Sequence, residues 1–233
     1  MMPYSYYGFD ATYLLVLIAM AIVGWAQFKV KSTFNKYDQL MTEHQVTGRQ
    51  AAEFILQQSG ITNVRVEPVA GHLTDHYDPR NKVLRLSEAT YQNTSVSAVA
   101  VAAHECGHAL QDAQDYKFMR VRAALVPVVN LGSTIAMPLI LIGFLMQIVG
   151  LIQLGILAFS LVLLFQLVTL PVEFDASRRA IEILGQGHIF TEAEVQPARK
   201  VLRAAGFTYV AASLSTLFQI VRFILLSNRS NRN

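Results

Sequence analysis

The chain has 233 residues, of which 53% are hydrophobic and only 15% charged, and its mean hydropathy is positive. This composition departs from that of soluble globular proteins toward that of proteins that lie in lipid. The formal net charge is +3, but the basic residues flank apolar segments instead of forming one patch. We therefore expect the lipid bilayer as a partner and no nucleic acid. The length fits a single domain with membrane anchors.

The first apolar stretch runs from about residue 11 to residue 28 and is long enough to cross a hydrocarbon core. Lys29, Lys31 and Lys36 follow it, and no basic segment precedes it. A cleaved signal peptide has the opposite order of charge, so residues 1–28 are predicted to form an uncleaved transmembrane anchor with its N-terminus outside.

Residues 29–122 are predicted to form the cytoplasmic part of a catalytic domain. Thr47 and Gln50 form a capping-box pair, and Gly60 provides a stop, which predicts a short helix. Two β-prone runs, NVRVEPV and KVLRLS, are separated by a stretch rich in turn formers and predict a small β-ribbon. The segment SVSAVAVAAHECGHALQDAQ then has the character of a buried helix, with Asn93, Thr94 or Ser95 as its cap.

A long apolar block at residues 131–171 contains no charged residue and is about twice as long as one span requires. Glutamines and glycines gather in its middle, at QIVGLIQLG, where a hairpin would turn. Arginines stand before and after the block, so both ends are expected on the cytoplasmic side. These residues therefore predict a transmembrane hairpin inserted into the catalytic domain.

Residues 172–206 are predicted to be the second part of the catalytic domain, with Pro197 in the first turn of a helix. Residues 207–226 are predicted to form a last apolar helix. If this helix spans the membrane, Arg229 and Arg232 finish outside, against the charge rule, so a helix that packs on the others or lies at the interface is the alternative. The fold class expected is a mainly α membrane protein with three or four transmembrane helices.

The pentapeptide His104-Glu105-Cys106-Gly107-His108 carries the chemistry. On a helix, His104 and His108 lie on one face, one turn apart, and can direct two imidazoles at one metal ion. Glu105 follows the first ligand, where its carboxylate reaches a water molecule that the metal activates. This pattern is typical of zinc peptidases in which the glutamate is the general base.

Two other residues, one inside the motif and one just after it, have lesser roles. Cys106 is the single cysteine, which excludes an intramolecular disulfide framework. Successive side chains on a helix are rotated by about 100°, so Cys106, two residues from each histidine, points away from both. We therefore expect it to be a small packing residue and not a ligand. Asp112 lies one turn beyond His108, where it either orients that histidine or faces solvent.

A catalytic zinc ion needs a third protein ligand. Gln114 and Val128 occupy the positions at which two known kinds of zinc peptidase carry it, and no His, Cys or Glu occurs from Ala109 to Val172. Glu173, directly after the predicted hairpin, is the first good candidate. Asp175 competes with it, but a helix would point the two about 160° apart, so only one can face the metal.

The remaining histidines carry weaker signals. His72 and His76 have the four-residue spacing, but the residues around them favour a turn over a helix. His188 follows Gly-Gln-Gly in a predicted loop, and it or Tyr77 could stabilise an oxyanion.

At HECGH, the SAVAVAAHE segment, the DHYDP to KVLRLS region and VEFDASRRA, the chain resembles the YugP family of bacterial membrane neutral zinc metallopeptidases. It is similar, more distantly, to HtpX-like and CAAX-prenyl membrane proteases. The resemblance implies a gluzincin-like α+β catalytic domain with Glu173 as third zinc ligand. The match is not complete, because Ser177 stands where the HtpX-like pattern has an aspartate. The resemblance also implies a β-strand beside the active-site helix, and KVLRLS is expected to be an exposed edge that pairs with an extended peptide.

These patterns predict an integral membrane zinc endopeptidase, and the resemblance implies that the membrane is a bacterial plasma membrane. His104, His108 and Glu173 would hold one catalytic Zn²⁺ ion, Glu105 would be the catalytic base, and a protein or peptide would be cleaved on the cytoplasmic side. Two alternatives remain at this stage. One is a catalytically silent membrane scaffold or regulatory subunit, and the other is a small transporter, which charge-free spans disfavour.

Overall fold

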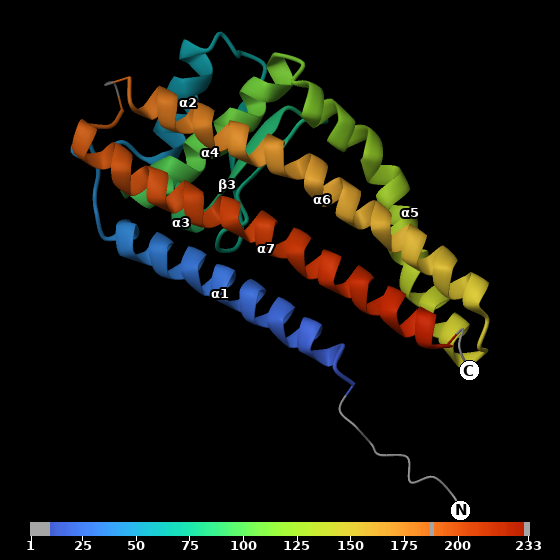
Figure 1. The fold of residues 1–233 in the computed structure, drawn as a ribbon. Helices are drawn as coiled ribbons and strands as arrows, with labels where there is room; N and C mark the ends of the chain where they lie inside the picture. Colours follow the sequence, from blue (N-terminus) through green and yellow to red (C-terminus); the bar gives the residue numbers. More distant parts are fainter. Residues whose placement is uncertain (1–9, 187–188, 231–233) are drawn as a thin grey trace, which may run out of the picture. The chain divides into compact units, whose positions relative to one another are not determined.

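The computed structural model describes residues 10–186 and 189–230. It is mainly helical, with a small sheet, and Figure 1 gives the order of the elements along the chain. The described residues form two compact units. The first, here called the apolar unit, contains residues up to 25, residues 125–166 and residues from 211 onward. The second, the mixed unit, contains residues 26–124 and 167–210.

Four long helices contribute to both units: α1 (Tyr13–Asp38), α5 (Lys117–Leu145), α6 (Val149–Leu184) and α7 (Glu192–Ser230). Each is long and apolar enough to cross a membrane. The described part of the chain is therefore a mainly α, membrane-type protein, as its composition predicted.

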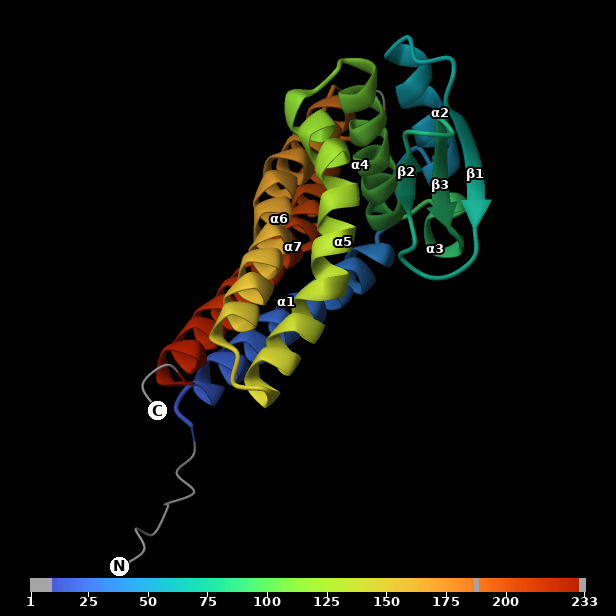
Figure 2. The same cartoon turned by 90° about the vertical axis from the view of Figure 1, so that its right-hand side faces the viewer.

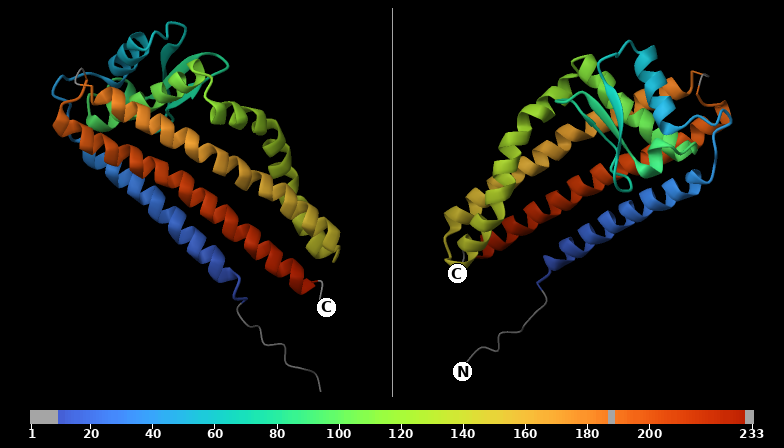
Figure 3. Two further views of the ribbon diagram at one scale, coloured as in Figure 1. Left: turned by 45° about the horizontal axis from the view of Figure 1, so that its top comes forward. Right: turned by 180° about the vertical axis from the view of Figure 1, so that it is seen from behind.

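Within the apolar unit, α5 and α6 form a helical hairpin that turns at residues 146–148 (Figure 3). The turn lies at the start of the glutamine- and glycine-containing segment. Glycines allow the two helices to approach closely, because a β-carbon at Gly155 would lie 2.6 Å from a side-chain atom of Ile140. A β-carbon at Gly143 would lie 2.7 Å from Ile152. Small residues at such contacts are typical of helices that pack in lipid.

The helices α2 (Gly48–Gln58), α3 (Glu88–Tyr91) and α4 (Val96–Ala113) belong to the mixed unit. The predicted capping box of Thr47 and Gln50 begins α2, and Gly60 follows it with a φ of 71°, which confirms the predicted stop. Among the three candidate caps for α4, Ser95 caps the helix, since its Oγ accepts a hydrogen bond from the Ala98 amide at 3.1 Å.

Three short strands form the sheet of the mixed unit: β1 (Arg65–Val69), β2 (His76–Asp78) and β3 (Val83–Ser87). Their order is β1-β3-β2, with β1 parallel and β2 antiparallel to β3 (Figure 2). The expected β-structure is present, but the turn-rich stretch between the two predicted strands supplies the third. KVLRLS is thus the central strand, and the expectation that it is an exposed edge was wrong, because β1 and β2 occupy both of its sides.

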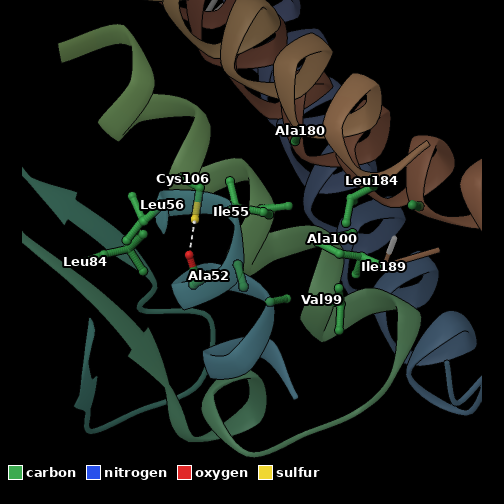
Figure 4. Packing of buried hydrophobic residues seen from close by; sticks show 14 of the residues in the cluster. Ala52, Ile55, Leu56, Leu84, Val99, Ala100, Cys106, Ala180, Leu184 and Ile189 are labelled. Atoms are coloured by element: carbon green, nitrogen blue, oxygen red, sulfur yellow. Dashed lines mark hydrogen bonds between the residues drawn. The ribbon is translucent and has the colours of Figure 1, made fainter. Parts of the chain in front are cut away.

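The hydrophobic core of the mixed unit lies where α2, α4 and β3 meet the residues 180–202. Figure 4 shows Cys106 directed at α2, where its thiol approaches the Ala52 carbonyl at 3.7 Å. Cys106 is fully buried, and burial raises the pKa of its thiol. This confirms the prediction that Cys106 packs in the core instead of binding a metal.

The start of α7 differs from the prediction. Thr191 and Glu194 form a capping pair, in which the Glu194 carboxylate accepts hydrogen bonds from the Thr191 amide at 2.7 Å and hydroxyl at 2.9 Å. Pro197 therefore lies in the second turn of α7 and not in the first. The helix continues without a break into the last apolar run.

Candidate metal centre

Helix α4 brings His104 and His108 together on one face, as their spacing predicted. Their rings meet edge to face, with centroids 4.8 Å apart. Glu173 on α6 completes the group: its Oε2 lies 3.3 Å from His104 Nε2 and 3.5 Å from His108 Nε2. The described residues thus contain one cluster of three side chains that could hold a metal ion, and it consists of the three predicted ligands.

The distances from Glu173 to the two imidazoles fit the ligands of a zinc ion. Four ligands at about 2.0–2.1 Å from zinc in a tetrahedron stand roughly 3.3–3.4 Å from one another. The distances of 3.3 and 3.5 Å between the glutamate oxygen and the two imidazole nitrogens match that separation. Two histidines and one carboxylate are also a donor set that zinc binds in catalytic sites, where a fourth position stays open.

The glycine of the motif allows α6 to approach. A β-carbon at Gly107 would lie 2.5 Å from the carbonyl oxygen of Ala176, closer than real β-carbons come to any atom. Because Ala176 lies one turn beyond Glu173, this contact fixes the height of the third ligand against α4.

Gln111 orients His108, a role that the sequence had offered to Asp112. The Gln111 amide nitrogen donates to the Val172 carbonyl at 2.8 Å and to the Asp175 carboxylate at 2.9 Å. Its oxygen lies 3.0 Å from Nδ1 of His108. Since the amide NH₂ is committed to two acceptors, the oxygen has to accept from Nδ1–H. His108 therefore carries its proton on Nδ1 and leaves Nε2 free to bind a metal.

The other two predicted ligands also have partners. Ser177 Oγ lies 3.1 Å from Nδ1 of His104, so the serine that replaces the aspartate of the HtpX-like pattern still contacts a ligand. Arg122 Nη1 donates to Oε1 of Glu173 at 3.3 Å. This contact leaves Oε2 directed at the histidines and provides a positive charge beside the buried carboxylate.

Burial opposes a charge on His108, but hydrogen bonding to Glu173 and the negative charges of Glu105 and Glu173 outweigh it. The pKa of His108 consequently lies above its ordinary value of 6.5. A proton therefore competes with a metal ion for this imidazole.

A cavity of about 280 Å³ in the mixed unit opens onto the cluster. His104, Glu105 and Glu173 lie in its wall, whereas most of the remaining surface is apolar and comes from α1, α4 and α7. The α1 wall is fixed to α4, because Ser97 Oγ donates to the Phe34 carbonyl at 2.8 Å. Tyr209 of α7 also lines the cavity and interacts with Glu173. No pattern in the sequence connects Tyr209 with the motif.

The weaker sequence candidates lie apart from the cluster. The Tyr77 hydroxyl donates to Asp112 at 2.6 Å, and Lys82 binds the same carboxylate. The two sequence candidates Tyr77 and Asp112 therefore bind each other and not a residue of the cluster. His72 packs edge-on against Phe34, and Nδ1 of His76 lies 2.8 Å from the Thr74 carbonyl. His188 lies outside the described residues. Asp175 accepts from Gln111 and Arg179 instead of facing the histidines.

The fold and the site together define a membrane-type helical protein with a His-His-Glu group that could hold a metal ion, beside an apolar cavity. Residues 12–228 match the family described as "Putative neutral zinc metallopeptidase", and the chain belongs to this family. It is similar to the "Putative membrane protease YugP" of Bacillus subtilis (strain 168), with 47% identity over 212 residues. The match covers 91% of this chain and 94% of that protein. No solved structure matches the chain.

Proposed function

We propose that this protein is a membrane-bound, zinc-dependent endopeptidase of the gluzincin type that cleaves peptide bonds at the cytoplasmic surface of the membrane. The observation that carries the proposal is the position of Glu105, which lies in the wall of one cavity together with the cluster ligands His104 and Glu173. A structural metal site would be closed by a fourth protein ligand. Among the described residues the cluster has three.

His104, His108 and Glu173 would hold one Zn²⁺ ion. When bound, zinc supplies a Lewis acid that polarises the scissile carbonyl and makes a water molecule more acidic. Glu105 takes the proton from the attacking water and delivers it to the nitrogen of the leaving amine. The Tyr209 hydroxyl donates to the carbonyl oxygen as negative charge develops on it, which replaces the Tyr77 or His188 of the sequence-based hypothesis.

The apolar wall of the cavity supports a polypeptide substrate with a hydrophobic side chain next to the cleaved bond. The cytoplasmic orientation rests on the charges: arginines and lysines flank the apolar runs on the side of the mixed unit, and such residues remain on the cytoplasmic side.

The decisive experiment compares the wild type with Glu105→Gln, both purified in detergent as the full chain. The zinc content of the two should be equal, near one ion per chain, because Glu105 is not a ligand. Hydrolysis of a casein or fluorogenic peptide substrate should fall by at least about 100-fold, which corresponds to loss of the general base. Removal of zinc with a chelator should abolish wild-type hydrolysis, and added zinc should restore it.

A variant that cleaves at the wild-type rate would refute the role of Glu105. A wild type that binds zinc but cleaves no substrate would instead favour a catalytically silent membrane scaffold.

A further inference from the structure

A second cavity, of about 330 Å³, lies in the mixed unit between α6 and α7. It shares one lining residue, Leu202, with the cavity at the metal cluster. Ser177, which contacts His104, also lines this cavity, so the cavity adjoins the cluster. The proposed peptidase reaction uses none of its charged side chains. These are Arg178, Glu182, Arg199 and Arg203.

The charge of this cavity is unbalanced. Arg178 is already paired with Asp175 and Glu182. Over residues 10–186 and 189–230, by contrast, neither Arg199 nor Arg203 has an ion-pair partner. The Nε of Arg199 is buried and has no hydrogen-bond partner among the same residues. A buried guanidinium donor without an acceptor is costly. Binding of an anion that supplies an acceptor to Arg199 and Arg203 is therefore favourable.

The arrangement of the two arginines fits a phosphate group. Arg199 and Arg203 are four residues apart on α7, so they lie on one face of the helix, one turn apart. Two like charges at this spacing repel each other unless an anion lies between them. Guanidinium groups bind phosphate oxygens in a planar, paired geometry, and a phosphate has enough oxygens to accept from both.

The position of the cavity along the helices brings it near a membrane surface. Arg178 lies seven residues beyond Pro171, the end of the apolar block of residues 131–171, which is about 10 Å along the helix. Arg203 lies four residues before Phe207, where the apolar run of α7 begins, or about 6 Å. Phe174, half exposed, and Ile181 add apolar surface beside the arginines. Basic cavities at this depth between membrane helices bind lipid headgroups.

We propose that the cavity between α6 and α7 is a binding site for a phosphate-bearing anion, held by Arg199 and Arg203. The anion can be the headgroup of an anionic phospholipid or free phosphate, because both present the same oxygens to the two guanidinium groups. This site is separate from the peptidase reaction, and its occupancy can be measured without any activity.

The test uses the full chain in detergent and native mass spectrometry. Phosphatidylglycerol and, separately, phosphatidylcholine are titrated into the wild type, into Arg199→Gln/Arg203→Gln and into the control Lys200→Gln/Arg80→Gln. The control removes the same charge from exposed positions that line neither cavity. Loss of each arginine should weaken phosphatidylglycerol binding about fivefold, so the double variant should lose about 25-fold. The control should bind like the wild type.

A second arm adds inorganic phosphate to the same samples and follows thermal unfolding. Stabilisation of the wild type by phosphate, absent from Arg199→Gln/Arg203→Gln, would identify free phosphate as a ligand. Lysine at both positions should restore part of the binding in either arm and show that the positive charge at these positions holds the anion. If the glutamine double variant and the control bind phosphatidylglycerol and phosphate equally well, the proposal is wrong.

Discussion

The backbone of Gly107 lies against the backbone of Ala176 so closely that a β-carbon at position 107 would sit 2.5 Å from the Ala176 carbonyl oxygen. Gly107 stands between the two histidines of α4, and Ala176 follows Glu173 by one turn of α6. The contact therefore joins the two halves of the candidate metal site through backbone atoms, which cannot rotate away as a side chain can.

Gly107→Ala should accordingly separate α4 from α6 and move Glu173 away from the histidines. Overpacking of this kind costs about 1–3 kcal/mol of unfolding free energy, more than the gain of about 1 kcal/mol that alanine brings to a helix. We expect a lower melting temperature and less bound zinc. Gly24→Ala is the matched control, since a β-carbon there meets no atom within 4 Å. Wild-type zinc content in Gly107→Ala would contradict this account.

Gln111→Ala should weaken zinc binding, because His108 would lose the acceptor that fixes its tautomer and ring orientation. Loss of such a partner lowers metal affinity about 10- to 100-fold. The measurement is a competition titration with a zinc chelator. Gln114→Ala removes an exposed glutamine from the end of the same helix and should keep the wild-type affinity. Equal zinc affinity in the two variants would show that Gln111 has only a packing role.

Tyr209→Phe and Tyr77→Phe separate the structure-based candidate for oxyanion stabilisation from the sequence-based one. Measured at saturating zinc, Tyr209→Phe should lower kcat about 100- to 1000-fold, since it removes a donor to the developing charge. Tyr77→Phe loses its hydrogen bond to Asp112 and should cost about 1 kcal/mol of stability with little change in kcat. If Tyr77→Phe lowers kcat more than Tyr209→Phe does, Tyr77 is the residue that stabilises the oxyanion.

Asp78 gives a prediction for pH. Its carboxylate accepts from the Asn81 side chain at 2.7 Å and from the backbone amides of Asn81 and Arg80, and these bonds, the Asn81 side chain foremost, lower its pKa from 3.8 to about 2. A carboxylate with a depressed pKa stabilises the fold above pH 3.8, and this contribution disappears as the pH falls through about 2.

At pH 7 the melting temperature of Asp78→Ala should therefore lie below that of the wild type. The difference between the two melting temperatures should narrow below about pH 4 and vanish near pH 2. Thermal unfolding in detergent at several pH values measures it. The control is Asp115→Asn, at an exposed carboxylate, which should melt close to the wild type throughout. If the difference in melting temperature stays constant down to about pH 2, Asp78 acts through packing alone.

The sequence by itself was sufficient for features that depend on local spacing. The four-residue spacing of His104 and His108 places two imidazoles on one helical face wherever the helix lies. The capping pair Thr47 and Gln50 satisfies backbone amides within one turn, so the start of α2 could be predicted without the rest of the fold. Charge-free apolar runs likewise identified the long helices, because their length relative to a bilayer is a property of the chain alone.

Tertiary structure decided the features that depend on which segments meet. Gln111 and Asp112 are adjacent in sequence, but only Gln111 meets Val172 and Asp175 of α6, and these contacts turn its oxygen toward His108. KVLRLS became a central strand because the turn-rich stretch folded back beside it, a pairing that periodicity does not specify. Tyr209, 36 residues beyond Glu173, joins the site because α7 packs along the same cavity. Such contacts join residues that are far apart in the chain, so local sequence patterns do not predict them.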